Sequence, residues 1–259
     1  MKYIFYKYQG TGNDFVIIDN RNQIFDKDNT KFIQQICNRH FGVGADGLIL
    51  LENHHTADFT MIYFNADGNK SSMCGNGARC MVAFAKYLDI IENEATFEAI
   101  DGMHHAFIED CIVKLQMQNV SDFKKQDDYV FLDTGSPHHV EFNNNLNQLN
   151  VKIEGRKIRC SKLYNKEGAN INFVEKINNE IFAVRTYERG VEDETLSCGT
   201  GVTAVALAMR YIGETEKNLL TIKTEGGDLQ VSFKKDSNGF NDVWLIGLAT
   251  LVFKGELEW

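Results

Sequence analysis

Two cysteines stand in the same unusual setting, which suggests thiol chemistry. Cys74 precedes Gly75-Asn76-Gly77 and Cys198 precedes Gly199-Thr200-Gly201, so each begins a Cys-Gly-x-Gly motif. Glycine lets the backbone approach a bound group closely. The amides of a helix's first turn lack intrahelical partners and carry the positive end of the helix dipole. Each motif can therefore hold an anion beside a thiol whose pKa is lowered by the same field.

A pair of thiols facing one ligand suits the inversion of a stereocentre. One thiolate removes a proton from one face and the other thiol returns a proton to the opposite face, which is general acid–base catalysis. Amides from two helix N-termini would stabilise the negative charge that develops on a substrate carboxylate. The remaining cysteines do not precede Gly-x-Gly and are interpreted as small buried apolar residues; they are Cys37, Cys80, Cys111 and Cys160.

An apolar segment of helical character follows each motif, from Ala78 to about Leu88 and from Val202 to Ile212. Both segments end with a basic residue, a tyrosine and an aliphatic residue at the same spacing from the cysteine. The pattern predicts an internal duplication in which each half places one thiol at the start of a helix. Two unrelated α+β halves that share a glycine turn are the alternative.

Strands are expected around these helices, because short runs of alternating apolar and polar residues lie between turn signals. They cover 3–8, 15–19, 48–51, 59–64, 95–99, 102–108, 111–118, 129–133, 181–187, 219–223, 229–233 and 243–251. A helix is expected over 28–39, where Asn29 or Thr30 can cap an apolar stripe. The polar segment 122–128 is the expected domain boundary, with one domain at 1–120 and the other from 121 onward.

Composition limits the possible functions. A chain of 259 residues with 43% hydrophobic residues can form two folded domains. A net charge of −9 argues against nonspecific binding to nucleic acid or to an anionic membrane surface. No signal-peptide core and no apolar run of transmembrane length is apparent. Six cysteines without a secretion signal indicate free thiols in a reducing compartment, and no pair has the spacing of a zinc site, so no metal is expected.

Five motifs together resemble those of the diaminopimelate epimerase family. They are Gly10-Thr11-Gly12-Asn13-Asp14-Phe15, Gly42-Val43-Gly44-Ala45-Asp46-Gly47, Met73-Cys74-Gly75-Asn76-Gly77-Ala78-Arg79-Cys80, Tyr187-Glu188-Arg189-Gly190 and Ser197-Cys198-Gly199-Thr200-Gly201. The resemblance implies an α+β fold of two pseudo-symmetric domains, each a strongly curved, mostly antiparallel sheet wrapped around a central helix. It also implies that residues 250–259 complete the first domain, which leaves 121–249 for the second, with the active site in the cleft between them.

The activity implied by the resemblance is a cofactor-independent isomerisation without pyridoxal phosphate. The family converts LL-2,6-diaminopimelate to the meso isomer in the bacterial cytoplasm, for the biosynthesis of lysine and of peptidoglycan precursors. We therefore expect a small-molecule substrate, no cofactor, and neither nucleic acid nor a membrane as partner. The oligomeric state is left open, and a homodimer is among the alternatives.

The resemblance also implies residue roles. Cys74 and Cys198 resemble the two acid/base residues, and a carboxylate cradle is implied at Gly75, Asn76, Gly199 and Thr200. Substrate-binding amides are implied at Asn13, Asn65 and Asn170, with contacts to the ammonium and carboxylate groups from Glu188 and Arg189. His138 and Ser136 are supporting residues, although the residues alone predict turn positions for Asn13 and His138.

Two positions depart from the family's pattern. Ser136 stands where the family often has asparagine, and Gly47 where some members have glutamine. A proline or hydroxyproline racemase is the nearest alternative, since those enzymes also carry paired cysteines in glycine turns, typically with histidine at the position of Asn76. A phenazine-type isomerase would keep the fold without the cysteine pair, and a non-catalytic binding protein would need neither thiol.

Overall fold

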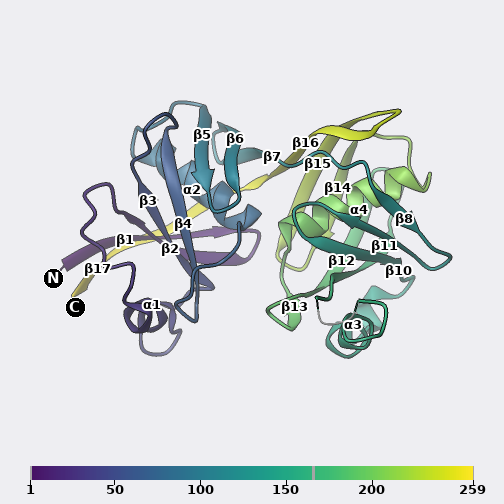
Figure 1. Cartoon of the computed structure of the whole chain (residues 1–259), viewed down its shortest axis with the longest axis horizontal. Helices are drawn as coiled ribbons and strands as arrows, with labels where there is room; N and C mark the ends of the chain where they lie inside the picture. The colour runs from purple at the N-terminus through teal and green to yellow at the C-terminus, as the bar shows by residue number, and fades with distance from the viewer. Residues whose placement is uncertain (1, 165–166, 259) are drawn as a thin grey trace. The chain divides into compact units, whose positions relative to one another are not determined.

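The computed structural model describes residues 2–164 and 167–258. The chain divides into two compact units, each with its own sheet and helices (Figure 1). Unit 1 comprises Met1–Leu115 and Gly247–Trp259, and unit 2 comprises Gln116–Ile246.

The sheet of unit 1 has the strand order β17-β1-β2-β3-β4-β5-β6-β7. Its strands are β1 (Lys2–Gly10), β2 (Asn13–Asp19), β3 (Gly47–Glu52), β4 (Phe59–Asn65), β5 (Glu94–Ala99), β6 (Gly102–Glu109), β7 (Ile112–Gln116) and β17 (Thr250–Glu258). Neighbours are antiparallel except for the parallel pairs β2–β3 and β4–β5. The pairing of β17 with β1 brings the two ends of the chain together within this unit (Figure 1).

The sheet of unit 2 repeats this order as β8-β9-β10-β11-β12-β14-β15-β16, again with two parallel pairs, β10–β11 and β12–β14. Its strands are β8 (Phe123–Lys125), β9 (Tyr129–Asp133), β10 (Pro137–Phe142), β11 (Asn170–Lys176), β12 (Ile181–Glu188), β14 (Leu219–Thr224), β15 (Gly227–Asp236) and β16 (Gly239–Leu248). The short strand β13 (Asp193–Thr195) pairs with β12. Strand for strand, the two sheets have the same topology.

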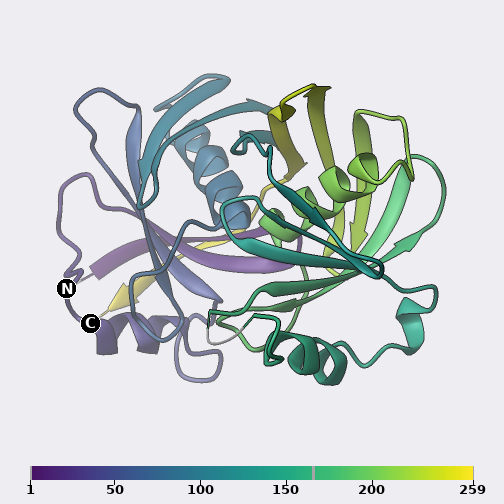
Figure 2. The same ribbon diagram turned by 45° about the vertical axis from the view of Figure 1, so that its right-hand side comes forward.

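Each sheet curves around one helix that is apolar and buried on nearly every side. In unit 1, α2 (Gly75–Tyr87) contacts β1, β2, β3, β4, β6 and β17, so strands from across the sheet reach it. In unit 2, α4 (Gly199–Tyr211) contacts β9, β10, β11, β12, β14 and β15, and Figure 2 shows strands surrounding both helices. A helix buried on all sides is a core element. The predicted fold class, two pseudo-symmetric α+β domains with a central helix each, is confirmed.

A second helix covers the outer face of each sheet. Helix α1 (Thr30–Cys37) is capped by the Asn29 side chain, which accepts a hydrogen bond from the Phe32 amide, and packs on β3. Helix α3 (Val151–Arg159) is capped in the same way by Asn150 and packs on β11 and β12. A 3₁₀ turn, η1 (Leu146–Gln148), precedes it. Since α1 follows β2 and α3 follows β10, the whole order of elements is repeated.

Several local expectations differ from the structure. The polar segment 122–128 contains β8, which pairs with β9, so it belongs to a sheet. The expected strand 243–251 is two strands, β16 and β17, separated at Ala249. Helix α3 was not predicted, because only two of its residues are buried and most of its surface is charged. Cys111 and Cys160 are exposed, which makes their interpretation as buried residues wrong, whereas Cys37 and Cys80 are buried.

Candidate active site

The two thiols occupy equivalent backbone positions. Cys74 is the N-cap of α2 with φ −118° and ψ 116°, and Cys198 is the N-cap of α4 with φ −120° and ψ 111°. The first intrahelical bonds run from the Ala78 amide to the Cys74 carbonyl, 2.8 Å, and from the Val202 amide to the Cys198 carbonyl, 2.9 Å. Neither thiol caps its own helix. Each sulfur therefore stands beside the positive end of a helix.

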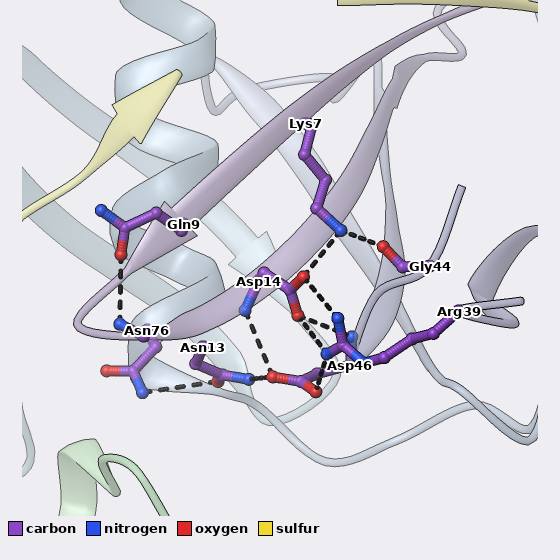
Figure 3. Close-up of polar contacts among 9 residues, drawn as sticks. Lys7, Gln9, Asn13, Asp14, Arg39, Gly44, Asp46 and Asn76 are labelled. Atoms are coloured by element: carbon purple, nitrogen blue, oxygen red, sulfur yellow. Dashed lines mark hydrogen bonds and ion pairs between the residues drawn. The ribbon is translucent and has the colours of Figure 1, made fainter. Parts of the chain in front are cut away.

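In unit 1 the thiol contacts an asparagine side chain. The Cys74 Sγ lies 3.6 Å from Asn13 Oδ1, and the Asn76 Nδ2 donates to the same oxygen at 3.4 Å. Asn13 Nδ2 donates to Asp46 Oδ2 at 2.5 Å, which orients the amide with its oxygen toward Cys74 and Asn76 (Figure 3). Asn13 is the first residue of β2, so the turn position expected from the residues alone is wrong.

A cluster of four charged residues holds Asp46 in place. Arg39 bridges Asp14 and Asp46 with contacts of 2.7 Å to each, and Lys7 pairs with Asp14 at 2.7 Å and donates to the Gly44 carbonyl (Figure 3). Burial alone would raise the Asp14 pKa, but the hydrogen bonds from Arg39 and Lys7 lower that pKa to about 2. Sequence analysis missed this cluster, although Asp14 and Asp46 lie inside glycine motifs.

In unit 2 the thiol is more enclosed. Cys198 is 9% exposed, and its Sγ lies 3.5 Å from Thr200 Oγ1. The Thr134 hydroxyl donates to the Thr200 carbonyl at 2.9 Å, which ties the start of α4 to the end of β9. A Cβ on Gly201 would stand 2.5 Å from Asn172 Oδ1, so the second glycine of this motif makes room for a buried asparagine.

The buried asparagine connects the thiol's helix to a histidine. Asn172 Nδ2 donates to His138 Nδ1 at 3.1 Å and to the His139 carbonyl at 2.9 Å, while its Oδ1 accepts from the Thr186 hydroxyl at 3.0 Å. Because His138 Nδ1 accepts, the ring proton resides on Nε2. Burial, followed by the charge of Arg189, lowers the His138 pKa to about 3, so the ring is neutral. Asn172 was missed by sequence analysis, although a polar residue inside a buried strand pattern was an available signal.

His138 does not lie in a turn. It is in β10, fully buried and paired in register with Asn170 of β11, so the expectation from the residues alone is wrong. Asn170 Nδ2 donates to Ser136 Oγ at 2.9 Å, and Asn170 Oδ1 accepts from the Arg189 amide at 2.9 Å. The Arg189 guanidinium donates to Ser136 Oγ at 3.3 Å. Three predicted residues, Ser136, Asn170 and Arg189, thus form one hydrogen-bonded group.

Two further predicted residues stand at strand ends. Glu188 ends β12, and its Oε2 accepts from the Thr195 hydroxyl at 2.9 Å. Asn65 ends β4, is exposed, and pairs with Gly47. A Cβ on Gly47 would stand 2.5 Å from Tyr63 Cε2 and 2.4 Å from the Phe64 carbonyl oxygen, so here the Tyr63 ring occupies the space beside the backbone.

Within residues 2–164 and 167–258, no three side chains of His, Cys, Asp or Glu gather as metal ligands would. Over the same described ranges, no helix is both long and apolar enough to cross a membrane.

The solved structures define the class of protein. A phenazine biosynthesis protein of the PhzF family from Bacillus anthracis matches with a TM-score of 0.80 at 15% identity, covering 100% of each chain. A probable proline racemase from Agrobacterium radiobacter K84 matches with a TM-score of 0.67 at 12% identity, covering 99% of this chain and 93% of the other. These likenesses place the chain in a fold class shared by racemases, epimerases and phenazine biosynthesis proteins.

Sequence comparison narrows the class to one family. The diaminopimelate epimerase model matches residues 5–116 and 130–251. A diaminopimelate epimerase from Flavobacterium psychrophilum is 60% identical over 250 residues, covering 96% of this chain and 98% of the relative. The enzyme of the same name from Chlorobaculum tepidum is 41% identical, with the same coverage. This chain belongs to the diaminopimelate epimerase family, and the predicted resemblance is confirmed.

Proposed function

We propose that this protein is an isomerase that converts LL-2,6-diaminopimelate to the meso isomer by proton transfer at one α-carbon. The observation that carries the proposal is the pair of thiols at equivalent helix N-caps in a chain of this family. The reaction serves the biosynthesis of lysine and of peptidoglycan precursors. The proline racemase and phenazine-type alternatives are disfavoured, since their structures share only the fold at 12–15% identity.

In the proposed mechanism the two half-sites act on one substrate molecule held between them. A thiolate on one side removes the α-proton as its electron pair moves into the carbon–carboxylate system. The opposite thiol donates its proton to the other face of the α-carbon. One sulfur gains a proton and the other loses one, so the balance is complete and no cofactor is consumed.

The substrate carboxylate at the reacting centre binds to the helix N-termini in this proposal. Gly75 and Asn76 lie in the first turn of α2, and Gly199 and Thr200 in the first turn of α4, where backbone amides point away from the helix. These amides and the two helix dipoles stabilise the charge that deprotonation adds to the carboxylate. Because the amides are fixed before the reaction, little reorganisation is needed.

The remaining ammonium and carboxylate groups of the substrate bind to the polar groups around the two thiols. Asn13 presents an oxygen, which suits an N–H donor of the substrate, while Arg189 suits a carboxylate. Asn65, Asn170 and Glu188 complete the recognition set. His138, neutral and buried, fixes Asn172 beside α4. Ser136, which stands where the family often has asparagine, accepts hydrogen bonds from Asn170 and Arg189.

The test is incubation with LL-2,6-diaminopimelate in D₂O, after removal of metal ions and without added pyridoxal phosphate. We expect loss of the α-proton NMR signal and appearance of the meso isomer on chiral chromatography. Absence of exchange with this substrate, together with exchange of L-proline, would transfer the function to the racemase alternative. Loss of activity after metal removal would refute cofactor independence.

Cysteine variants test the two-base mechanism. Cys74→Ala and Cys198→Ala are each expected to lower turnover by at least about 100-fold, the usual range for a missing acid or base. Cys160→Ala is the matched control, because Cys160 is an exposed thiol at the end of α3 and should be dispensable. Normal turnover in either of the first two variants contradicts the mechanism.

The same proposal includes a cytoplasmic enzyme that binds neither nucleic acid nor membranes, with a homodimer and a monomer as the alternative assemblies. Sedimentation velocity at micromolar concentration distinguishes a dimer from a monomer. Elution from heparin at low salt tests the expectation from the net charge of −9.

A further inference from the structure

A buried arginine lies in the same helix as the first thiol and reaches back to the first turn of that helix, and no step of the proposed mechanism uses it. Arg79 belongs to α2 and is 0% exposed. Side chains on a helix lean toward its N-terminus, and Arg79 does so: Nη1 donates to the Gly75 carbonyl at 3.5 Å and Nη2 to Thr11 Oγ1 at 2.7 Å. Its Nε has no hydrogen-bond partner.

The guanidinium has no carboxylate partner in the described part of the chain. Burial lowers the pKa of Arg79, and the acidic groups that act in the opposite direction are the thiols of Cys80 and Cys74. The ionisable side chains that pack against α2 from the strand beside it are Tyr6 and Tyr8 on β1, whose rings both contact Phe84. Neither of them is an acid that is charged at neutral pH. A buried arginine remains cationic, so its charge acts on whichever thiol can ionise.

Of the two thiols, only Cys74 is suited to carry the compensating charge. Burial raises the pKa of Cys80 to about 12, against the opposing influence of Arg79, so Cys80 remains a thiol at neutral pH. Cys74 is partly exposed and stands at the N-terminus of α2, where the helix field also favours a thiolate. The Asn13 oxygen at 3.6 Å favours the protonated form, and the full charge of Arg79 opposes it.

The second half of the molecule lacks this charge. The position in α4 that corresponds to Arg79, five residues after the cysteine, is Thr203. Its hydroxyl donates to the Gly199 carbonyl at 3.0 Å, much as Arg79 reaches the Gly75 carbonyl. The nearby cation of unit 2 is Arg189, which is partly exposed and hydrogen-bonded to Ser136. Two otherwise matching helices therefore differ by one buried positive charge beside the thiol.

We propose that Arg79 is a positioning residue that holds Cys74, and not Cys198, as the thiolate in the ligand-free protein. A two-base isomerase needs one thiolate and one thiol at the start of each turnover. Two thiols in equal fields that titrate independently would share one pKa, so no more than about half of the protein would hold one thiolate and one thiol at any pH. One unsymmetric charge gives the two sulfurs different pKa values, and an acid and a base are then present together. The inference rests on the proposed function for its meaning, whereas its test requires no turnover.

The test measures alkylation of each cysteine by iodoacetamide as a function of pH, with peptide mass spectrometry to separate Cys74 from Cys198. Only the thiolate reacts, so the pH at half-maximal rate reports the ionisation of each sulfur. The accessibility of a cysteine to the reagent changes its maximal alkylation rate but does not change the pH at which half of that rate is reached. In the unmodified protein we expect the Cys74 midpoint to lie below the Cys198 midpoint.

Substitution separates the charge from the fold. Arg79→Met removes the charge while filling similar space, and it should raise the Cys74 midpoint by about one pH unit or more, which is tenfold in thiolate at pH 7. The Cys198 midpoint should not move. Thr203→Val, the matched variant in α4, should leave the Cys74 midpoint unchanged.

Three results would overturn the inference: an unchanged Cys74 midpoint in Arg79→Met, equal movement of both midpoints, or a Cys74 midpoint at or above that of Cys198 in the unmodified protein. The comparison of the Cys74 and Cys198 midpoints in the unmodified protein tests the inference even if Arg79→Met does not fold. If the midpoints behave as expected but no diaminopimelate is isomerised, the inference about Arg79 stands and the proposed function fails.

Discussion

Substituting alanine for the second glycine of each cysteine motif should have opposite effects in the two units. Gly77 and Gly201 are the third residues of α2 and α4. A Cβ on Gly77 would meet the mobile ends of apolar side chains, the nearest being Ile49 Cδ1 at 3.0 Å. A Cβ on Gly201 would stand 2.5 Å from Asn172 Oδ1, which no real Cβ contact tolerates.

The magnitude follows from what Asn172 would lose. Asn172 is fully buried, and its Oδ1 accepts from Thr186 at 3.0 Å, so a shift breaks a buried hydrogen bond or compresses the core. The loss of the hydrogen bond or the compression of the core would each lower the free energy of unfolding by about 2 kcal/mol. Alanine is favoured over glycine in a helix by about 1 kcal/mol, and this gain applies to both substitutions. Gly201→Ala should therefore destabilise by about 1 kcal/mol, and the two variants should differ by about 2 kcal/mol.

Equilibrium urea denaturation followed by circular dichroism gives the two free energies of unfolding. A double-mutant cycle of Gly201→Ala with Asn172→Ala tests the cause, because removing the asparagine should remove most of the penalty. Turnover of Gly201→Ala should also fall, since the new methyl group would stand 3.4 Å from the Cys198 Sγ. If Gly201→Ala is as stable as Gly77→Ala and has normal turnover, the packing argument is refuted.

Three other predictions concern the groups around the thiols. The pKa of Asp14 is about 2 when folded, below its usual value, so its pairing with Arg39 stabilises the protein above about pH 4 and is lost as pH falls toward 2. Asp14→Asn should thus lose about 2 kcal/mol at pH 7 and about half as much at pH 3 in urea titrations. His138 has a pKa of about 3 in the folded protein, below its ordinary value. Between these two values the unfolded chain binds a proton at His138 and the folded protein does not. Stability should fall as pH drops below about 6.5, and a slope equally steep in His138→Gln would contradict this. Asp46→Ala should free the Asn13 amide and raise KM about fivefold, the equivalent of one hydrogen bond, whereas an unchanged KM would refute the orienting role.

Periodicity and turn residues predicted most of the fold because they report local physics. The alternation of β4 and the apolar stripe of α1 are properties of short segments, and both elements were predicted within a few residues. The repeat of Cys-Gly-x-Gly predicted that the two halves are alike, and the strand order confirms it. Helix α3 carries little apolar signal, since it is largely exposed and contacts the sheet mainly through Val151 and Gly155.

The candidate site was predicted in part. The thiols, their glycines and the group of Ser136, Asn170 and Arg189 carry recognisable motifs, and the structure brings the members of that group together. Asn172 and Thr186 carry no motif of their own, and the glycine motifs that contain Asp14 and Asp46 did not indicate the roles of these two carboxylates. Their importance arises mainly from partners more than ten residues away in the chain, such as Thr186 for Asn172 and Asn13 for Asp46, which no local pattern specifies.

The sequence by itself determined where the two thiols stand, because the start of a helix after a glycine motif is a local preference of the backbone. It also determined that the chain folds as two similar units, since each half repeats the same pattern of turns. Only the tertiary structure decided the environment of each thiol. The orientation of the Asn13 amide depends on Asp46, the neutral state of His138 on its burial beside Asn172, and the charge near Cys74 on the enclosure of Arg79. These are electrostatic properties, and electrostatic energies depend on distance in space and on exclusion of water, which are set only when the sheet has closed around its helix.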